Sequence, residues 1–170
     1  MKIRKAIYKD AKTLTRIQIL GWQTAYAHIF PPAKLAALSQ EAWQPLWEER
    51  LKNPLSQILI AEEEDVALGF IGFGPYRNGD IFEMNQGEIY AIYLDPLHKG
   101  KGCGKALCDQ ACESFKEDSI TQVMVWTLEK NHAAQGFYEA IGFEKTSVVK
   151  SVELLDTPLD EIQYQKILFS

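Results

Sequence analysis

Residues 94–107 read LDPLHKGKGCGKAL, and this stretch decides the fold. A predicted strand ends at Asp95-Pro96, a short glycine-rich loop follows, and a helix begins at once. Closely spaced glycines let a ligand approach the backbone, and the unpaired amides of a first helical turn carry partial positive charge. The pattern predicts a pyrophosphate-binding loop, the alternative being a loop whose glycines only start a helix. The glycines are Gly100, Gly102 and Gly104, and the lysines that add positive charge are Lys99, Lys101 and Lys105.

The spacing differs from the two standard nucleotide-binding motifs. A P-loop needs four residues before Gly-Lys-Ser/Thr and a hydroxyl for magnesium, whereas Lys105 is followed by Ala106. A dinucleotide fingerprint needs Gly-x-Gly-x-x-Gly, and here the glycines alternate singly. The loop therefore indicates a phosphate ligand of another kind.

A second signal is the stretch NHAAQGFYEAIGF at residues 131–143. Asn131 can cap a helix and Gly142 can end it. Phe137 and Ile141 are four residues apart and suit a pair that faces the core. Tyr138 lies one residue further round, so the pattern by itself indicates an amphipathic helix with a surface tyrosine.

The rest of the chain alternates strand and helix signals without a repeat or a linker. Strands alternating with single helices in the second half predict a mixed α/β layer. Asp10 is the expected cap of the first helix. We expect strands at 2–6, 58–61, 66–73 (ended by Gly74-Pro75), 88–94, 123–127, 143–149 and 162–168, helices at 10–26, 35–51, 102–117 and 132–141, and a turn at 77–80.

Composition narrows the class of protein. The 170 residues, 46% hydrophobic and 24% charged, predict one globular domain spanning 1–170. A net charge of −5 argues against a general nucleic-acid binder. No apolar run could span a bilayer and the first residues lack a signal-peptide core, so we expect a soluble cytoplasmic protein without a membrane partner.

The three cysteines lie close together, at Cys103, Cys108 and Cys112. None of the three histidines stands at zinc-motif spacing from them, so we expect no metal site. Cys108 and Cys112 share one face of the predicted helix. We interpret the cysteines as small apolar side chains packed under that helix.

Together the two motifs resemble the GCN5-related N-acetyltransferase (GNAT) family. The resemblance covers residues 88–143, about a third of the chain. Residues 99–104 match the family's Gln/Arg-x-x-Gly-x-Gly/Ala loop, with Lys99 in the Gln/Arg place, and residues 131–143 match the helix and strand that follow. The resemblance implies the GNAT fold, a central, mostly antiparallel sheet with a splayed strand pair and flanking helices.

The resemblance also implies how acetyl-CoA, as acyl donor, is held. The main chain of Ile92, Tyr93 and Leu94 would pair with the pantetheine arm, and Asn131 would hydrogen-bond the same region. The pyrophosphate would lie on the loop amides of Lys99, Gly100, Lys101, Gly102, Cys103, Gly104 and Lys105.

The implied reaction is direct transfer of the acetyl group to an amine. Tyr138 would lie beside the sulfur and protonate the leaving thiolate, and Glu88 is the candidate general base. Two alternatives stay open for Glu88: a solvent carboxylate at a strand end, or a relayed water as base.

The acceptor is an unidentified primary amine of a small molecule or peptide. Family members build this pocket from the first helices and nearby loops, which points to Trp22, Tyr26 and Tyr76, although core packing explains the aromatic spacing equally well. A homodimer is left open. A non-catalytic acyl-CoA sensor or scaffold is the alternative function.

Overall fold

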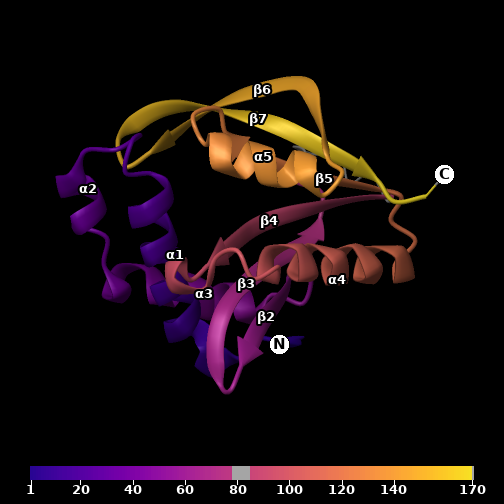
Figure 1. Ribbon diagram of the computed structural model, residues 1–170, viewed down its shortest axis with the longest axis horizontal. Coiled ribbons are helices and arrows are strands. Elements are labelled where there is room, and N and C mark those ends of the chain that lie inside the picture. The colour runs from indigo at the N-terminus through magenta and orange to yellow at the C-terminus, as the bar shows by residue number, and fades with distance from the viewer. Residues whose placement is uncertain (78–84, 170) are drawn as a thin grey trace. The chain divides into compact units, whose positions relative to one another are not determined.

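The computed structural model describes residues 1–77 and 85–169 (Figure 1). It has helices and strands in the mixed α/β order expected from the sequence. The strands are β1 (Lys2–Lys5), β2 (Gln57–Glu63), β3 (Val66–Pro75), β4 (Gln86–Leu94), β5 (Gln122–Leu128), β6 (Glu144–Leu154) and β7 (Thr157–Ile167). The helices are α1 (Ala11–Ala25), α2 (Pro32–Ala36), α3 (Gln40–Lys52), α4 (Cys103–Glu117) and α5 (His132–Ala140), with 3-10 turns at Tyr8–Asp10 and Pro96–His98.

The strands form one sheet in the order β1-β2-β3-β4-β5-β7-β6. β1–β2, β2–β3, β5–β7 and β6–β7 pair antiparallel, and β4–β5 pair parallel. The parallel ladder joins residues 86–89 to 122–125, while β4 itself runs on to Leu94. This mostly antiparallel sheet, with a β4–β5 ladder that ends early, is the fold class that the sequence predicted.

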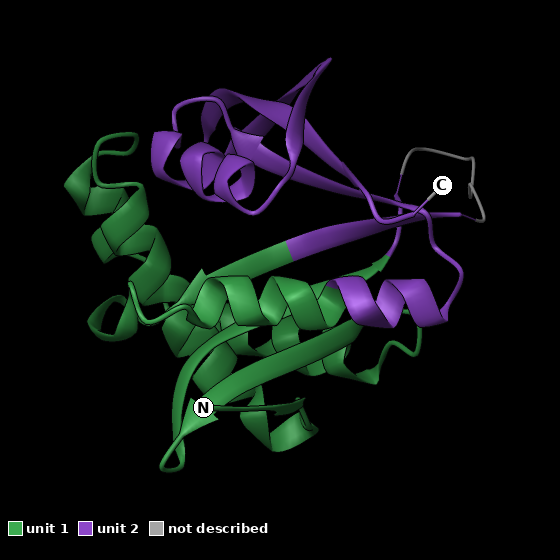
Figure 2. Cartoon of the chain, turned by 45° about the vertical axis from the view of Figure 1, so that its right-hand side comes forward, with its two compact units in different colours: residues 1–74, 91–111 green, residues 75–90, 112–170 purple. Residues whose placement is uncertain are grey.

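The chain divides into two compact units, and each consists of two stretches of sequence (Figure 2). Unit 1 is Met1–Gly74 with Ala91–Ala111, and unit 2 is Pro75–Tyr90 with Cys112–Ser170. Both boundaries fall inside an element, because β4 and α4 each begin in one unit and end in the other.

Unit 1 buries the inner face of α1. Its buried residues recur at helical spacing, and Leu14 and Ile17 pack with Phe70 of β3 in one core cluster. Trp47 of α3 completes that cluster, and its indole N–H donates to Gln18 Oε1 at 2.8 Å. Such an amphipathic helix gains its stability from this packed face more than from intrinsic propensity.

Unit 2 is built on β5, β7 and β6, with α5 against them. Tyr138 of α5 lies 5.7 Å from the Phe143 ring and 6.2 Å from the Tyr164 ring of β7, centroid to centroid. The Tyr164 hydroxyl donates to Glu139 on α5 at 2.8 Å, and the Lys166 ammonium donates to the carbonyl of Ile141 at 2.7 Å. These contacts attach the C-terminal end of the helix to β7.

Three local predictions need correction. β3 runs through Pro75 instead of ending before it. Proline is tolerated there because Pro75 is the last residue of the strand, where its missing N–H interrupts no hydrogen bond of the ladder. The Asp10 carboxylate caps no amide of α1; it accepts from Ile7 N and pairs with Arg4 at 2.8 Å. The closing strands are longer than expected, because β6 and β7 meet at a tight turn. The expected turn at 77–80 falls largely outside the described residues.

No helix in residues 1–77 and 85–169 is long and apolar enough to cross a bilayer.

Two glycines of β3 give a direct test of how closely β3 and β4 pack in unit 1. A Cβ on Gly69 would lie 2.6 Å from Leu94 Cδ2 and 2.8 Å from the carbonyl oxygen of Tyr93. We expect Gly69→Ala to destabilise the protein by about 1–3 kcal/mol, because the backbone must shift to relieve the overlap. The matched control is Gly72→Ala, whose Cβ meets only Ile58 Cγ1, at 3.9 Å. Equal melting temperatures for the two variants would contradict the packing described.

Candidate active site

The end of β4 is fixed by contacts within unit 1. Tyr93 packs 5.6 Å from the Phe70 ring, and its hydroxyl accepts a hydrogen bond from the Trp22 indole at 3.0 Å. Gly21 of α1 lets the Tyr93 ring approach, since a Cβ there would lie 3.1 Å from Tyr93 Cδ1. Ile92, Tyr93 and Leu94 are all half-buried. The main chain proposed to pair with a ligand therefore belongs to a strand with a well-packed tyrosine.

Asp95 anchors the loop that follows β4. Its carboxylate is buried, accepts from Leu97 N at 3.0 Å and pairs with Arg16 of α1 at 2.9 Å. Its own amide donates to Leu68 O of β3 at 2.8 Å. Burial raises the pKa of Asp95, but the hydrogen bonds from Arg16 and Leu97 outweigh burial, so its pKa lies below the ordinary value. The carboxylate therefore stays charged and holds α1 to the start of the loop.

The glycine loop has the backbone conformation that its sequence requires. Gly100 and Gly102 have φ of +79° and +77°, a region that side chains rarely adopt, and no atom lies within 4 Å of an added Cβ at either. α4 starts at Cys103, and its first helical hydrogen bond runs from Ala106 N to Gly102 O at 3.0 Å. The amides of residues 103–105 therefore have no partner within the helix, as at any helix start. Gly104 is already inside α4 and buried.

The positive charges near the start of α4 come from the three lysines of the predicted loop. Lys99, Lys101 and Lys105 are exposed. The Lys105 ammonium pairs with Asp109 one turn along α4, at 2.5 Å, which leaves Lys99 and Lys101 as the cations nearest the loop glycines in sequence. An exposed cation beside free amides suits a diphosphate group.

The cysteines are part of the packing under α4. Cys103, Cys108 and Cys112 are buried, as the sequence predicted. Burial raises the pKa of the Cys103 thiol to about 11, so it stays protonated at neutral pH and is a poor nucleophile. In the part of the chain that the structure describes, no group of three or more His, Cys, Asp or Glu residues could hold a metal ion.

Asn131 of unit 2 caps α5, as predicted. Its side-chain Oδ1 accepts from Ala134 N at 3.2 Å, and the residue is 8% exposed. Capping uses only the side-chain oxygen of Asn131. The two N–H groups of the same amide are donors that suit a carbonyl acceptor.

Tyr138 is the buried residue of α5, with 5% exposure. The expected surface position is therefore wrong: Phe137 and Ile141 are only half-buried, while Tyr138 packs between Phe143 and Tyr164. Helical spacing alone could not distinguish the two neighbouring faces, because the partner of this face is β7, which lies far along the chain.

Glu88 is also buried, with 3% exposure, so it is not a solvent carboxylate. Its Oε2 accepts from Arg77 N at 2.9 Å and from Arg77 Nε at 3.3 Å, and its Oε1 accepts from Arg77 Nη2 at 2.8 Å. The same guanidinium lies 3.9 Å from the centroid of the Tyr90 ring. Burial lowers the pKa of Arg77, but the hydrogen bonds and charge of Glu88 outweigh it, so the net pKa is raised.

Tyr90 completes this group in unit 2. Its hydroxyl donates to the carbonyl of Pro75 at 2.5 Å. Burial raises the pKa of Tyr90 to about 12, even though Arg77 lowers it. Tyr90 is therefore a neutral donor at physiological pH. In the group formed by Arg77, Glu88 and Tyr90, the carboxylate is that of Glu88.

The three residues expected at the acceptor differ in their surroundings. Trp22 is buried and lies 5.0 Å from the rings of both Tyr26 and Trp43. Tyr76 is buried in unit 2, where its hydroxyl accepts from Gln163 at 2.8 Å. Tyr26 is half-buried. Packing therefore accounts for Trp22 and Tyr76, and Tyr26 is the most accessible of the three.

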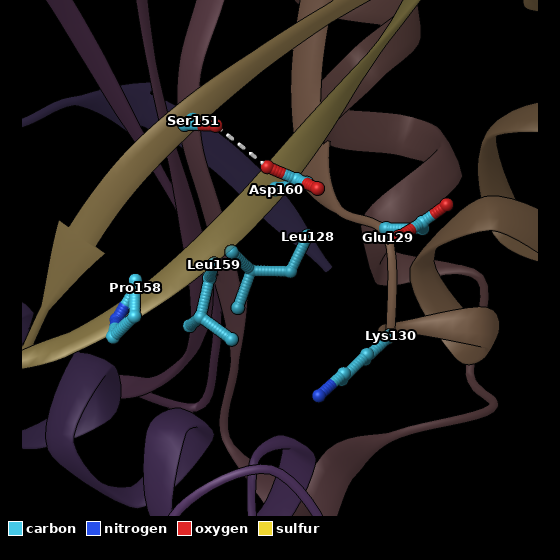
Figure 3. A pocket seen from close by; sticks show the side chains of 7 residues that line it. All are labelled: Leu128, Glu129, Lys130, Ser151, Pro158, Leu159 and Asp160. Carbon is cyan, nitrogen blue, oxygen red and sulfur yellow. Dashed lines mark hydrogen bonds between the residues drawn. The ribbon is translucent and has the colours of Figure 1, made fainter.

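A small cavity of about 280 Å³ lies in unit 2, where β5 ends beside the β6–β7 hairpin (Figure 3). Ser151 donates to Asp160, its neighbour across the β6–β7 ladder, at 2.8 Å, and the Glu129 and Lys130 side chains point in opposite directions in Figure 3. It contains none of the residues that the sequence singled out.

The structure thus brings the predicted residues together in two sets. Ile92–Leu94, the loop 99–105, Trp22 and Tyr26 belong to unit 1, and Glu88, Asn131, Tyr138 and Tyr76 belong to unit 2. Sequence reasoning did not predict two ion pairs next to these residues, Asp95 with Arg16 and Arg77 with Glu88. Asp95 was interpreted only as a strand end, although Asp before Pro is a frequent start of a capped turn.

The chain matches the model of a known protein family. Residues 20–143 match the model of the Acetyltransferase (GNAT) family. The uncharacterised N-acetyltransferase YuaI of Bacillus subtilis is 30% identical over 146 residues, which cover 85% of this chain and 81% of YuaI. The L-amino acid N-acyltransferase MnaT of Escherichia coli is 30% identical over 96 residues, which cover 56% of this chain and 54% of MnaT.

Solved structures show the same fold. The PaiA N-acetyltransferase of Thermoplasma acidophilum, in complex with coenzyme A, matches with a TM-score of 0.74 at 22% identity and covers 98% of each chain. YncA of Salmonella typhimurium, with its cofactor acetyl-CoA, matches with a TM-score of 0.72 at 23% identity, over 99% of this chain and 94% of that one.

Asp95→Asn tests the anchor of the loop. The amide keeps an oxygen for Leu97 N but loses the charge that faces Arg16, so we expect a loss of about 1–3 kcal/mol at neutral pH. The pKa of Asp95 is lower in the folded state than in the unfolded state. The extra stability of the wild type over Asp95→Asn is therefore fully present above the ordinary carboxyl pKa, and it is lost as pH falls through the lowered pKa.

Thermal melts of both proteins from pH 8 to pH 3 measure this difference. The gap in melting temperature should stay constant above about pH 5 and close below about pH 4. Asp109→Asn is the control, because it removes an exposed pair and should change stability by less than about 1 kcal/mol. A gap that persists unchanged at pH 3 would rule out the charged anchor.

Proposed function

The chain belongs to the Acetyltransferase (GNAT) family, and we propose that it transfers the acetyl group of acetyl-CoA to a primary amine of a small molecule or peptide. The glycine loop carries this proposal. Gly100 and Gly102 have positive φ and open space at Cβ, and the helix start offers unpaired amides, which together fit a pyrophosphate.

The remaining donor contacts that we propose are those that the family resemblance implies. The main chain of Ile92–Leu94 pairs with the pantetheine arm like an added strand. Asn131, whose oxygen caps α5, donates its side-chain N–H to the same arm. Lys99 and Lys101 add charge beside the diphosphate. The complexes of PaiA with coenzyme A and of YncA with acetyl-CoA support a donor of this class.

In the proposed reaction a neutral amine attacks the thioester carbonyl. The C–N bond forms, the C–S bond breaks, the amine loses a proton to a base, and the departing thiolate takes one from an acid. Tyr138 is the proposed acid. A phenol has an ordinary pKa near 10 and therefore still holds its proton at neutral pH. Amides near Leu94 would polarise the carbonyl.

Glu88 is the proposed base, acting directly or through a water. Its buried carboxylate pairs with the Arg77 guanidinium at 2.8 Å and also accepts from Arg77 N at 2.9 Å, so Arg77 occupies both oxygens that could accept a proton. Arg77 exposes 62% of its side chain, so it can move into solvent more easily than Glu88 can. We propose that Glu88 accepts a proton when Arg77 is displaced from it.

The acceptor that we propose is a primary amine. Tyr26, edge-on to Trp22 and Phe30, offers the half-buried ring that could face a cationic amine. MnaT is named an L-amino acid N-acyltransferase, which makes amino acids the first acceptors to test. A non-catalytic acyl-CoA sensor remains the alternative, and turnover with any amine distinguishes the two.

We also keep two broader predictions as proposals. A single domain over 1–170 is supported because β4 and α4 are continuous across the boundary between the two units. The cytoplasmic location stays a prediction from the sequence.

Gly102→Asp tests donor binding. Coenzyme A binds only the native state, so it should raise the melting temperature of the wild type. The aspartate adds a side chain at positive φ and a negative charge beside the diphosphate, so we expect the shift to vanish while circular dichroism shows an intact fold. Gly102→Ala adds only the strained Cβ and should keep part of the shift. An unchanged shift in folded Gly102→Asp would reject this loop as the site.

Tyr138→Phe tests the acid. It keeps the ring that packs on Phe143 and Tyr164 and removes only the hydroxyl. We expect kcat to fall by about ten- to several-hundred-fold with KM for acetyl-CoA little changed. Tyr164→Phe is the matched control, because it also removes a buried tyrosine hydroxyl, bonded to Glu139, and should lower stability but not kcat. An intact kcat with a raised KM would make Tyr138 a binding residue only.

Glu88→Gln tests the base. We expect a lower rate at alkaline pH and an unchanged thermal shift with coenzyme A, because the change removes proton uptake and not donor contacts. Arg77→Gln breaks the same ion pair from the other side. If the Arg77–Glu88 ion pair had only a structural role, Glu88→Gln and Arg77→Gln would lower stability and activity to a similar extent. Activity of Glu88→Gln within about twofold of the wild type across pH would exclude Glu88 as the base.

A further inference from the structure

One face of the sheet in unit 2 carries the side chain of Glu88 and further charged groups. Glu88 of β4 is the register partner of Met124 of β5. Leu128 of β5 is the register partner of Glu161 of β7. Directly paired residues project from the same face of a sheet, and so do residues two apart along a strand. Glu88, Trp126 and Glu161 therefore share one face, which we call the Glu88 face.

Lys150 of β6 lies on the Glu88 face, between a carboxylate and an aromatic ring. It is the register partner of Glu161, and its ammonium lies 3.3 Å from a carboxylate oxygen of Glu161. The same nitrogen lies 4.1 Å from the centroid of the half-buried Trp126 ring. A carboxylate and the face of an indole ring both attract an ammonium group. Trp126 and Glu161 thus form a cation site that the chain fills with its own lysine.

The proposed base has surroundings of the same kind. The Arg77 guanidinium pairs with the buried Glu88 carboxylate at 2.8 Å and lies 3.9 Å from the centroid of the Tyr90 ring. Burial lowers the pKa of Arg77, its hydrogen bonds to Glu88 raise it, and the charge of Glu161 raises it further. Glu161 is therefore within electrostatic reach of Arg77. The Glu88 face carries two neighbouring cation sites, and each consists of a carboxylate and an aromatic ring.

The strand register sets the span between the two carboxylates. The β5 partners of Glu88 and Glu161 are Met124 and Leu128, which lie about 13 Å apart along the strand. The two glutamates stand on opposite sides of β5, so their Cα atoms are also about 10 Å apart across the sheet. Both side chains project from the same face. A linear molecule with a cation at each end can therefore bridge them.

Lys150 opposes the binding of such a molecule in two ways. Its ammonium already occupies the site of Trp126 and Glu161, and a tethered group competes with a free ligand at a high effective concentration. Its positive charge also repels a second cation that approaches the same carboxylate. An acceptor with a single ammonium group meets neither obstacle, because it needs only the site at Glu88. Discrimination between ligands often depends on a repulsive element of this kind.

We propose that Lys150 is a specificity-determining residue, which restricts the acceptor to amines without a second positive charge by occupying the cation site of Trp126 and Glu161. The inference rests on the proposed function, because it concerns the amine from which Glu88 takes a proton. It narrows the acceptor class to amines with one cationic group and disfavours long diamines. Removal of the Lys150 side chain should open the site to a diamine.

Binding of octamethylenediamine tests this role without turnover, and the indole N–H signal of Trp126 in the ¹⁵N–¹H spectrum reports it. We expect Lys150→Ala to bind the diamine about tenfold or more tightly than the wild type does. Lys150→Arg keeps a cation in the site and should bind the diamine as weakly as the wild type. Glu161→Gln added to Lys150→Ala should remove the gain, because the site then lacks its negative charge.

Kinetics measure the consequence for the choice of acceptor. The ratio of kcat/KM for octamethylenediamine to kcat/KM for octylamine should rise about tenfold or more in Lys150→Ala. Lys145→Ala is the matched control, because Lys145 is an exposed lysine of the same strand. Its register partner is Tyr164, which lies on the opposite face of the sheet and packs against α5. The ratio should therefore not change in Lys145→Ala.

The binding and kinetic measurements separate two kinds of failure. A wild type that acetylates no amine would count against the proposed function, and the diamine titration would still decide the role of Lys150. Unchanged affinity for the diamine in Lys150→Ala would overturn the inference. So would a gain in affinity that persists when Glu161→Gln is added.

Discussion

A buried carboxylate, that of Asp95, joins three parts of unit 1 where β4 ends. Its side chain pairs with Arg16 of α1 and accepts from Leu97 N, its amide donates to Leu68 of β3, and its carbonyl accepts from His98 N. A buried charge is tolerated only when it is paired and hydrogen-bonded, so these partners have to stay together. That requirement fixes the point from which the glycine loop leaves the sheet.

The loop then reaches α4 with little further support from side chains. Gly100 and Gly102 supply two positive φ values, and the buried Cys103 begins the helix. Positive φ at these two glycines turns the chain into α4, and Gly102, which precedes the helix, has no side chain that could cap it. A helix start of this kind is an anion site by geometry and dipole. The proposed donor site is thus formed by backbone groups and anchored by one side chain.

The sequence predicted this region well because its signals are local. A strand end, three glycines and a helix start within 14 residues determine their own conformation. Asn131 as a cap follows for the same reason. The turn at Leu155-Asp156 was missed because it contains no glycine, although both residues adopt positive φ. The β6–β7 hairpin was therefore longer than expected.

The remaining differences come from contacts between distant parts of the chain. Tyr138 was expected at the surface, since only Tyr164, 26 residues further on, shows that its face of α5 is the packed one. The partner of Glu88 is Arg77, 11 residues away and adjacent to residues that the structure does not describe. Neither pairing has a periodic or motif signal. Both belong to unit 2, where the proposed chemistry takes place.

If the backbone at the start of α4 holds the donor's diphosphate, its amides should respond to that group alone. This can be followed in the ¹⁵N–¹H spectrum of the protein, titrated in parallel with coenzyme A and with pantetheine, which lacks the diphosphate. We expect the amides of Cys103, Gly104 and Lys105 to shift strongly with coenzyme A and to remain in place with pantetheine. Amides of this turn that do not move with coenzyme A, while others elsewhere do, would contradict it.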